Sequence, residues 1–374
     1  MSKLVVDVDF PGGSVEIVRL RARGPVELAL APDNASDVRQ WFSFRVHSST
    51  PAPRTITIAN VEDSTFPSGW LDYEVMASAD GTRWSRIPTE LEDGALQFDH
   101  VPRSPVMHYA YFVPYPLGRL ERLLRRASQR PHVEVAVLGE SVQGRPIYEA
   151  TVGDPDRDRT LWVIARQHPG ESPSSWVTEG LLRRLMDEDD ATVGSLLSRC
   201  VVRVAPMVCP DGVELGNMRT SASGANLNRV WDGPDDDAPE VACLLERIQE
   251  TGADLFLDVH ADESAAFAFA VRSEGNPSFD ERIDAEEAEL TDLLETHCHE
   301  FKDERYYDED EPGQADLSCA SNQIGESLGI PALTLELPMK GSGHERVRPG
   351  WNDRRARKFG AGLVDALEAW TRER

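Results

Sequence analysis

Four short apolar runs divide residues 116–374, and polar segments separate them. The runs cover residues 161–165, 201–208, 255–259 and 332–337, and their composition is typical of buried strands. Helical stretches are expected between them at residues 174–186 and 238–251, and a further strand pair precedes them at 133–138 and 147–152. Such alternation predicts an α/β domain with a mixed, largely parallel sheet flanked by helices.

Residues 1–115 have a different pattern. Short alternating or β-branched runs recur there, with turn sequences such as Pro11-Gly12-Gly13 between them. They lie at residues 4–10, 15–20, 42–46, 55–58, 71–77 and 108–113. An all-β antiparallel sandwich domain is therefore expected. Beyond Pro114-Tyr115-Pro116, residues 117–127 have the apolar spacing of an amphipathic helix, so we expect two domains, 1–115 and 116–374.

The charge of the chain limits its partners. The 374 residues include 65 acidic and 39 basic side chains, for a net charge of −26. Nucleic acid and anionic membranes would repel such a protein, so neither is expected as a partner. No secretory leader is expected, and five cysteines without a C-x-x-C pair indicate free thiols in a reducing cytoplasm. Nothing in the sequence indicates an oligomeric state.

Candidate metal ligands follow two of the apolar runs. His168-x-x-Glu171 comes after the first run, and His260 closes the third. The carboxyl ends of parallel strands meet at one edge of a sheet, so these side chains are expected to converge. We also expect Gly170 to allow the tight backbone between His168 and Glu171. Two imidazoles and one carboxylate leave the fourth position of zinc open for water, which predicts one catalytic Zn²⁺ per chain. Structural histidines at strand ends are the alternative.

Further polar residues gather at the same edge. Arg219, Asn228 and Arg229 lie in or beside a Gly/Ser-rich loop, where guanidinium groups could bind an anionic substrate group or pair with local acids. Glu336 lies in the otherwise apolar run 332–338, where it could act as a general base or pair with an arginine. Asp258 shares a strand face with His260 and could fix its imidazole or be solvated.

As a set, these residues resemble the zinc metallocarboxypeptidases. The resemblance is strongest to the cytosolic carboxypeptidase-like branch, which includes the tubulin deglutamylases and bacterial relatives, and its β-rich N-terminal segment is similar to residues 1–115. The matching stretches lie at residues 167–171, 210–212, 216–219, 224–231, 256–260 and 334–336.

The resemblance implies a role for each site residue. His168, Glu171 and His260 would bind zinc, and Arg219 would polarise the scissile carbonyl and stabilise the oxyanion. Asn228 and Arg229 would hold the C-terminal carboxylate of the substrate, and Glu336 would be the general base. The implied activity is a metallocarboxypeptidase that removes the C-terminal amino acid from peptides or proteins, including acidic residues such as glutamate.

Two other functions stay open. One is a zinc-dependent deacylase or amidohydrolase of N-acyl amino acids, and the other is a non-catalytic binding protein with a vestigial zinc site. The chain also departs from the family pattern. Residues 314–323 lack the tyrosine that many carboxypeptidases place over the substrate, with Tyr306 and Tyr307 the nearest. Asn226 stands where members often have Asp, and Ala261 where a Gly is often found.

Overall fold

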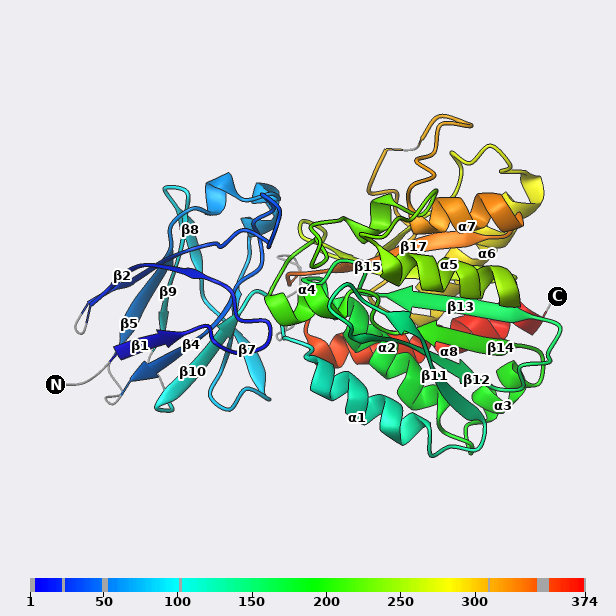
Figure 1. Cartoon of the computed structure of the whole chain (residues 1–374), viewed down its shortest axis with the longest axis horizontal. Coiled ribbons are helices and arrows are strands. Elements are labelled where there is room, and N and C mark those ends of the chain that lie inside the picture. Colours follow the sequence, from blue (N-terminus) through cyan, green and yellow to red (C-terminus); the bar gives the residue numbers. More distant parts are fainter. Residues whose placement is uncertain are drawn as a thin grey trace.

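The computed structural model describes residues 4–21, 24–48, 53–100, 103–308, 310–341 and 350–372. A β-rich N-terminal part lies beside a larger α/β part, and the two chain ends lie at opposite ends of the molecule (Figure 1). No helix among the described residues is long and apolar enough to cross a membrane.

The N-terminal part contains two five-stranded sheets that share a buried core. One sheet has the order β1-β4-β10-β6-β7, and the other has the order β2-β3-β5-β9-β8. The first comprises β1 (Leu4–Asp7), β4 (Ser43–Ser48), β6 (Val75–Ser78), β7 (Trp84–Ile87) and β10 (Val106–Ala110). The second comprises β2 (Glu16–Leu20), β3 (Val26–Ala29), β5 (Arg54–Ile58), β8 (Glu90–Glu92) and β9 (Ala95–His100). Two 3-10 helices, η1 (Val61–Asp63) and η2 (Pro67–Trp70), follow β5.

The predicted all-β domain is confirmed, with one parallel pair in it. Strands β3 and β5 run parallel, whereas every other strand pair recorded in these two sheets is antiparallel. Between β3 and β5, which belong to the second sheet, the chain crosses to the first sheet as β4, so it returns to the second sheet in its original direction. The sequence patterns missed β3, β7, β8 and β9.

The α/β part contains one seven-stranded sheet with the order β11-β12-β14-β13-β15-β17-β16. Its strands are β11 (Val133–Glu140), β12 (Pro146–Val152), β13 (Thr160–Ala165), β14 (Val201–Ala205), β15 (Leu255–Asp262), β16 (Phe269–Val271) and β17 (Ala332–Pro338). The four central strands are parallel, and β11, β12 and β16 pair antiparallel at the edges. The predicted mixed, largely parallel sheet is thus confirmed.

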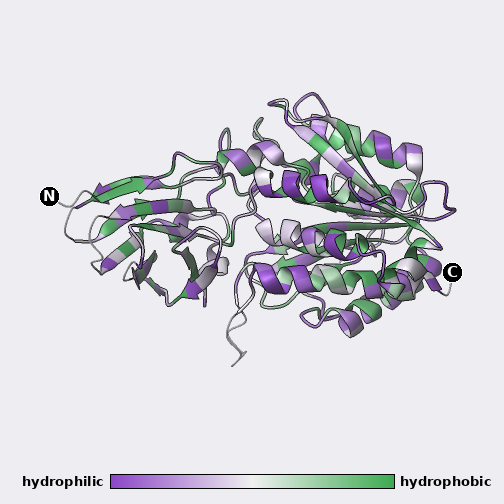
Figure 2. Cartoon of the chain, turned by 90° about the horizontal axis from the view of Figure 1, so that it is seen from below, coloured by the Kyte–Doolittle hydropathy of each residue, from purple (hydrophilic) through white to green (hydrophobic). Residues whose placement is uncertain are grey.

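Helices cover both faces of this sheet, and the strands lie between them (Figure 2). The helices are α1 (Leu117–Ala127), α2 (Ser172–Leu185), α3 (Ala191–Leu197), α4 (Pro210–Leu215), α5 (Pro239–Thr251), α6 (Glu281–His297), α7 (Ala320–Leu328) and α8 (Asp353–Arg372). A short 3-10 helix, η3 (Leu227–Arg229), lies between α4 and α5.

Alternation along the central strands explains where the polar residues point. Leu257 and Val259 belong to the core on the α2 side, whereas Phe256 belongs to a second core that includes α5 and α7 side chains. Because successive side chains of a strand point to opposite faces, Asp258 and His260 share the face of Phe256. The pairing of β15 with β17 sets His260 opposite Glu336.

The change of architecture falls after β10. That strand ends at Ala110 and α1 begins at Leu117, so we propose that the domain boundary lies between residues 115 and 116. Across this boundary the packing is continuous, because the Val113 carbonyl accepts hydrogen bonds from Ser172 Oγ and Trp176 Nε1 at 3.0 and 2.9 Å.

Candidate metal centre and active site

Three predicted ligands meet at one buried point. His168 follows β13, Glu171 directly precedes α2, and His260 lies in β15. Their exposed fractions are 3%, 3% and 1%, and one potential ligand atom from each lies within 4.8 Å of the others. Glu171 Oε1 lies 2.6 Å from His168 Nδ1, and Glu171 Oε2 lies 2.9 Å from His260 Nδ1. Two nitrogens and a carboxylate in a compact group fit the donor set that zinc prefers in catalytic sites.

The outer nitrogen of each imidazole has its own partner. His260 Nε2 lies 2.8 Å from Asp258 Oδ2, and His168 Nε2 lies 3.0 Å from Asn226 Oδ1. Asp258 is fully buried, which rules out the solvated alternative for this side chain. Such partners fix the ring orientation of a metal-binding histidine and leave its other nitrogen directed at the metal.

A chain of hydrogen bonds supports Asp258 in turn. Gln167 Nε2 donates to Asp258 Oδ2 at 2.6 Å, and Trp231 Nε1 donates to Gln167 Oε1 at 2.8 Å. Asn226, which the sequence marked only as a departure, and Gln167, which it did not single out, therefore both help to orient the imidazoles. Their position within motifs that also carry candidate ligands is the signal that could have identified them.

Burial and charge set the protonation of this group. Burial lowers the pKa of His168 to about 4, although the adjacent Glu171 opposes the shift. Neutral imidazole, the form that binds metal, is therefore favoured at this residue. Burial would raise the pKa of Glu171, but the two imidazoles outweigh it and the net pKa is lowered. At His260 burial acts to lower the pKa, but Asp258 and Glu171 outweigh it and raise the pKa, and the same carboxylates favour a cation here.

The loop between His168 and Glu171 differs from our expectation in one detail. Gly170 is not among the glycines with positive φ, so backbone conformation does not require glycine there. A Cβ on Gly170 would lie 2.8 Å from Met218 Cα, and the Gly170 N–H donates to the Met218 carbonyl at 2.8 Å. Close approach of the 218 loop is therefore the reason for glycine. The left-handed residue is Arg166, with φ of 65°, and its buried Nε donates to the Pro169 carbonyl at 2.7 Å.

Glu336 lies on β17 opposite His260, with β16 on its other side. Its side chain is half-buried, and no ion pair between Glu336 and an arginine occurs in the described ranges, which contradicts the salt-bridge alternative. Burial raises the pKa of Glu336 to about 8; His260 opposes the shift, and nearby carboxylates add to it. A carboxyl group that titrates near neutral pH can both accept and return a proton.

The three predicted substrate-binding residues stand in different environments. Asn228 Nδ2 lies 3.4 Å from His260 Nε2, and Asn228 Oδ1 accepts from the Ala320 N–H at 2.8 Å. The Arg229 side chain is 44% exposed, and its Nε lies 3.5 Å from Asp316 Oδ2. Arg219 is half-buried, and no carboxylate of the described residues forms an ion pair with it. The alternative, in which these arginines pair with local acids, therefore applies to Arg229 through one long contact and does not apply to Arg219.

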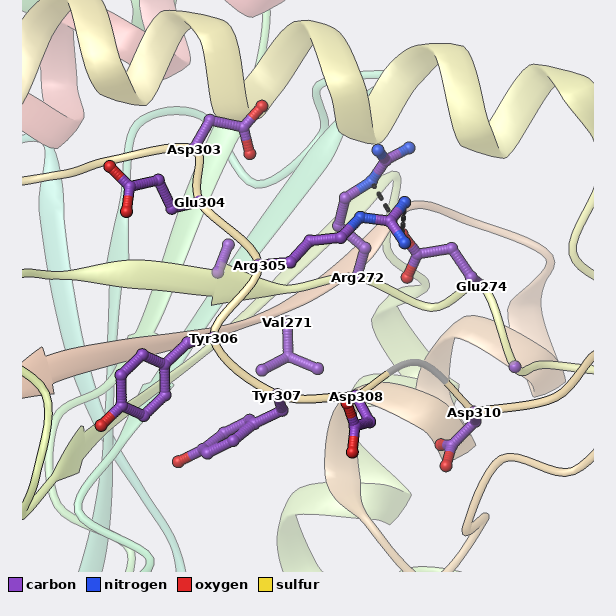
Figure 3. A pocket seen from close by; sticks show the side chains of 12 residues that line it. Val271, Arg272, Glu274, Asp303, Glu304, Arg305, Tyr306, Tyr307, Asp308 and Asp310 are labelled. Carbon is purple, nitrogen blue, oxygen red and sulfur yellow. Dashed lines mark hydrogen bonds and ion pairs between the residues drawn. The ribbon is translucent and has the colours of Figure 1, made fainter.

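Tyr307 lines a pocket beside the candidate site. Residues 270–272, 274–275, 303–308 and 310 form this pocket. The Tyr307 hydroxyl donates to Asp262 Oδ2 at 2.6 Å, at the end of β15. Burial raises its pKa, and the charge of Glu336 adds to the shift. Figure 3 shows the rings of Tyr306 and Tyr307 pointing away from the part of the pocket where Arg272 and Arg305 approach Glu274. Tyr307 thus lies close to Asp262 and Glu336, although it is outside residues 314–323.

Comparison with known proteins gives consistent results. The family model described as the cytosolic carboxypeptidase N-terminal domain matches residues 6–112, and the model described as zinc carboxypeptidase matches residues 120–345. An uncharacterized protein of Zymomonas mobilis is 34% identical over 368 residues, which cover 97% of this chain and 96% of that protein. A solved structure of a metallo-carboxypeptidase from Pseudomonas aeruginosa, in complex with (2-guanidinoethylmercapto)succinic acid, has 36% identity to this chain and a TM-score of 0.94. That match covers 98% of both chains.

Eukaryotic relatives are longer than this chain. Human cytosolic carboxypeptidase 6 is 27% identical over 334 residues, which cover 80% of this chain and 64% of the human protein. The match to cytosolic carboxypeptidase 6 of Caenorhabditis elegans covers 62% of that protein. The chain therefore spans less than two thirds of either protein.

Proposed function

Because this chain belongs to the zinc carboxypeptidase family, a family of metallocarboxypeptidases, we propose that it removes the C-terminal amino acid from peptides or proteins. His168, Glu171 and His260 would hold the zinc ion in this reaction. We also propose a cytosolic location, by analogy with the names of the cytosolic carboxypeptidase relatives.

One observation carries the proposal: the Asn228 side chain contacts a candidate metal ligand, and Arg229 follows Asn228 directly in the chain. Its amide nitrogen lies 3.4 Å from the candidate ligand His260, and the next residue is the half-exposed Arg229. A group bound by Asn228 and Arg229 would thus lie beside the metal centre. Guanidinium binds carboxylate in a bidentate manner, so a free C-terminal carboxylate fits this position.

Glu336 and Arg219 would perform the proton transfer and charge stabilisation. Zinc, when bound, supplies a Lewis acid that acidifies water and polarises a carbonyl. Glu336 would accept a proton as the water oxygen bonds to the scissile carbonyl carbon, and Arg219 would stabilise the negative charge on the carbonyl oxygen. When the C–N bond breaks, Glu336 would return the proton to the leaving amine.

The preferred C-terminal residue is a separate question. Glutamate is one candidate, although a protein of net charge −26 would repel a polyglutamate chain at long range. The Pseudomonas relative binds a succinic acid derivative with two carboxylates and a guanidino group. We propose that this compound binds here through a carboxylate held by Asn228 and Arg229, and calorimetry with the zinc-loaded protein would measure that binding.

Glu336→Gln is the principal test of the mechanism. The substitution keeps the size of the side chain but removes the base, so we expect kcat to fall by roughly 100-fold or more with zinc content unchanged. Glu134→Gln, on the exposed side of β11, is the matched control and should keep full activity. A Glu336→Gln enzyme with near-normal kcat would overturn the mechanism.

Substrate panels separate the proposed activity from the alternatives. Blocked dipeptides that differ in the C-terminal residue, compared with N-acetyl amino acids, distinguish a carboxypeptidase from a deacylase. Hydrolysis of N-acetyl amino acids alone would favour the deacylase. Purified protein that takes up no zinc would favour a vestigial binding site.

A further inference from the structure

A carboxylate of the N-terminal domain binds the backbone of the Arg219 loop. Asp33 is 4% exposed and lies in the segment between β3 and β4. Its Oδ1 accepts the Met218 N–H at 2.6 Å, and its Oδ2 accepts the N–H groups of Arg219 and Thr220 at 2.7 and 3.0 Å. Three consecutive amides are thus directed at one side chain more than 180 residues away in sequence.

The residues that follow Asp33 fit closely against the same loop. Asn34 Nδ2 donates to the Ala222 carbonyl at 2.7 Å, and Asn217 Nδ2 donates to Asn34 Oδ1 at 2.5 Å. A Cβ on Gly224, whose φ is +90°, would lie 2.5 Å from the Ala35 carbonyl oxygen. These contacts leave the loop little freedom to move relative to the N-terminal domain.

A second part of the N-terminal domain lies against the Arg219 side chain. The Arg219 guanidinium carbon is 5.5 Å from the centre of the Phe66 ring, within the range of a cation–π contact. Two hydrogen bonds to the Gln40 side chain hold the Phe66 backbone. The Phe66 N–H donates to Gln40 Oε1 at 3.1 Å, and Gln40 Nε2 donates to the Phe66 carbonyl at 3.2 Å. Beyond it, a Cβ on Gly69 would lie 2.7 Å from Glu263 Cβ, so η2 packs directly on the end of β15.

We propose that the N-terminal domain is part of the catalytic centre, with Asp33 and Phe66 acting as positioning residues for Arg219. The inference rests on the proposed function, since it concerns how Arg219 reaches the scissile carbonyl. Asp33 fixes the backbone of Arg219 and Phe66 guides its guanidinium. No carboxylate of the described residues pairs with that guanidinium, so the cation stays available for a substrate oxygen.

The same loop links Asp33 to the candidate metal ligands. The Met218 carbonyl accepts a hydrogen bond of 2.8 Å from the N–H of Gly170. Gly170 lies between His168 and Glu171 in the sequence. A shift of the loop would therefore alter the distance between Arg219 and the metal centre. Displacement of a catalytic group by about 1 Å can cost roughly 100-fold in rate.

Amide hydrogen exchange tests the positioning without any substrate. In Asp33→Ala, amides in a peptide covering residues 216–222 should exchange about 10-fold faster or more, because three N–H groups lose their acceptor. Asp37→Asn is the matched control, since Asp37 is an exposed carboxylate in the same segment. Unchanged protection in Asp33→Ala would overturn the proposal even if the enzyme proved to have another substrate.

A double-mutant cycle tests the route through Arg219. Asp33→Asn should lower kcat by about 30-fold and change KM much less, because Arg219 acts on the developing oxyanion. In the Arg219→Ala background the same change should cost less than about 3-fold. Phe66→Leu should lower kcat by a few-fold and depend on Arg219 in the same way.

Three results would count against the positioning role. Equal losses from Asp33→Asn in both backgrounds would mean that Asp33 does not act through Arg219. A KM effect without a kcat effect would place Asp33 in substrate binding, and a matching fall in melting temperature and zinc content would reduce its role to stability. If wild-type protein cleaves no peptide, the proposed function fails, and the exchange experiment alone decides the role of Asp33.

Discussion

The proposed metal-binding half (His168, Glu171 and His260) and the proposed substrate-binding half (Arg219, Asn228 and Arg229) of the candidate site are held in different ways. In the metal-binding half, His168, Glu171 and His260 are at most 3% exposed, and their hydrogen-bond partners among the described residues belong to the α/β domain. In the substrate-binding half, Arg229 is 44% exposed and has one loose ion pair, whereas Arg219 depends on contacts from the N-terminal domain. Burial within one domain therefore orders the first half, and docking of a second domain orders much of the other.

This difference fits the separate tasks that we propose for the two halves. A metal ligand must stay within a narrow geometry, and side chains held by packing and further hydrogen bonds provide it. A residue that binds a substrate carboxylate can remain solvated in the free enzyme, because the bound substrate then completes the hydrogen bonds of that residue. Substitutions in the two halves should thus produce different losses.

The largest effect is expected in the metal-binding half, from His260→Ala. The change removes one ligand and leaves Asp258 and Glu171 close to the same cavity without an imidazole between them. Activity should fall on the order of 1,000-fold or more, because water with its usual pKa of ~15.7 is a poor nucleophile. Metal analysis should find one zinc per chain in wild type and much less in the variant.

His299→Ala is the control for that experiment, because His299 is exposed and lies outside the metal group. It should keep both zinc and activity. A His260→Ala protein that retained stoichiometric zinc and turnover would show that the buried group is not the catalytic centre.

In the substrate-binding half, Arg229→Ala should act mainly on KM. The loss of a charge-assisted, bidentate contact should lower kcat/KM by roughly 100-fold, with little change in kcat or melting temperature. Arg229→Lys keeps the charge but not the planar fork, so an intermediate loss is expected. Steady-state kinetics on one peptide would measure all three proteins, and a pure kcat effect would place Arg229 in the chemical step instead.

The sequence predicted the metal-binding half better than the substrate-binding half. The run at 161–165 is wholly apolar and the run at 255–259 is apolar except for Asp258, because both faces of β13 and β15 are buried. That composition identified the strands and the polar residues near their ends. The family resemblance is also confirmed. The site roles remain predictions, although the structure brings the three proposed ligands and Glu336 together.

Other features had no local signal. Strand β8 (Glu90–Glu92) is exposed along its length, so no apolar pattern identified it. Asp33 contacts amides far away in sequence, and Tyr307 contacts Asp262, 45 residues before it. Contacts between distant segments such as these become visible only in the folded chain.

A smaller effect is expected from Asn226, which links the two halves. Its Oδ1 lies near His168 Nε2, and it also accepts the Asn228 N–H at 3.0 Å. Asn226→Ala should weaken zinc binding by about 10-fold, the lower end of the range for partners of metal-binding histidines. Asn226→Asp should bind zinc at least as tightly as wild type, because a carboxylate also orients the His168 ring and adds negative charge. Competition with a chelator would measure both, and equal affinities in all three proteins would remove Asn226 from the metal centre.

The last effect depends on pH and contrasts two buried carboxylates, Glu171 beside two imidazoles and Glu240 near the like charge of Asp211. Glu240, in the first turn of α5, is fully buried, and its Oε2 has no hydrogen-bond partner among the residues that the structure describes. Burial raises its pKa to about 7, with Asp211 adding to the shift. The folded protein then holds this proton more tightly than the unfolded chain, so the group makes the protein less stable as pH rises from about 4.5 to 7.

Glu240→Gln should therefore stabilise the protein by about 2 kcal/mol at pH 8 and have little effect near pH 4.5. Thermal unfolding at the two pH values measures the difference, and kcat should stay unchanged because Glu240 lies outside the catalytic group. The same substitution at Glu171 removes a ligand and should instead abolish zinc binding. A Glu240→Gln protein that is equally stable relative to wild type at both pH values would mean that this carboxyl group keeps an ordinary pKa in the folded state.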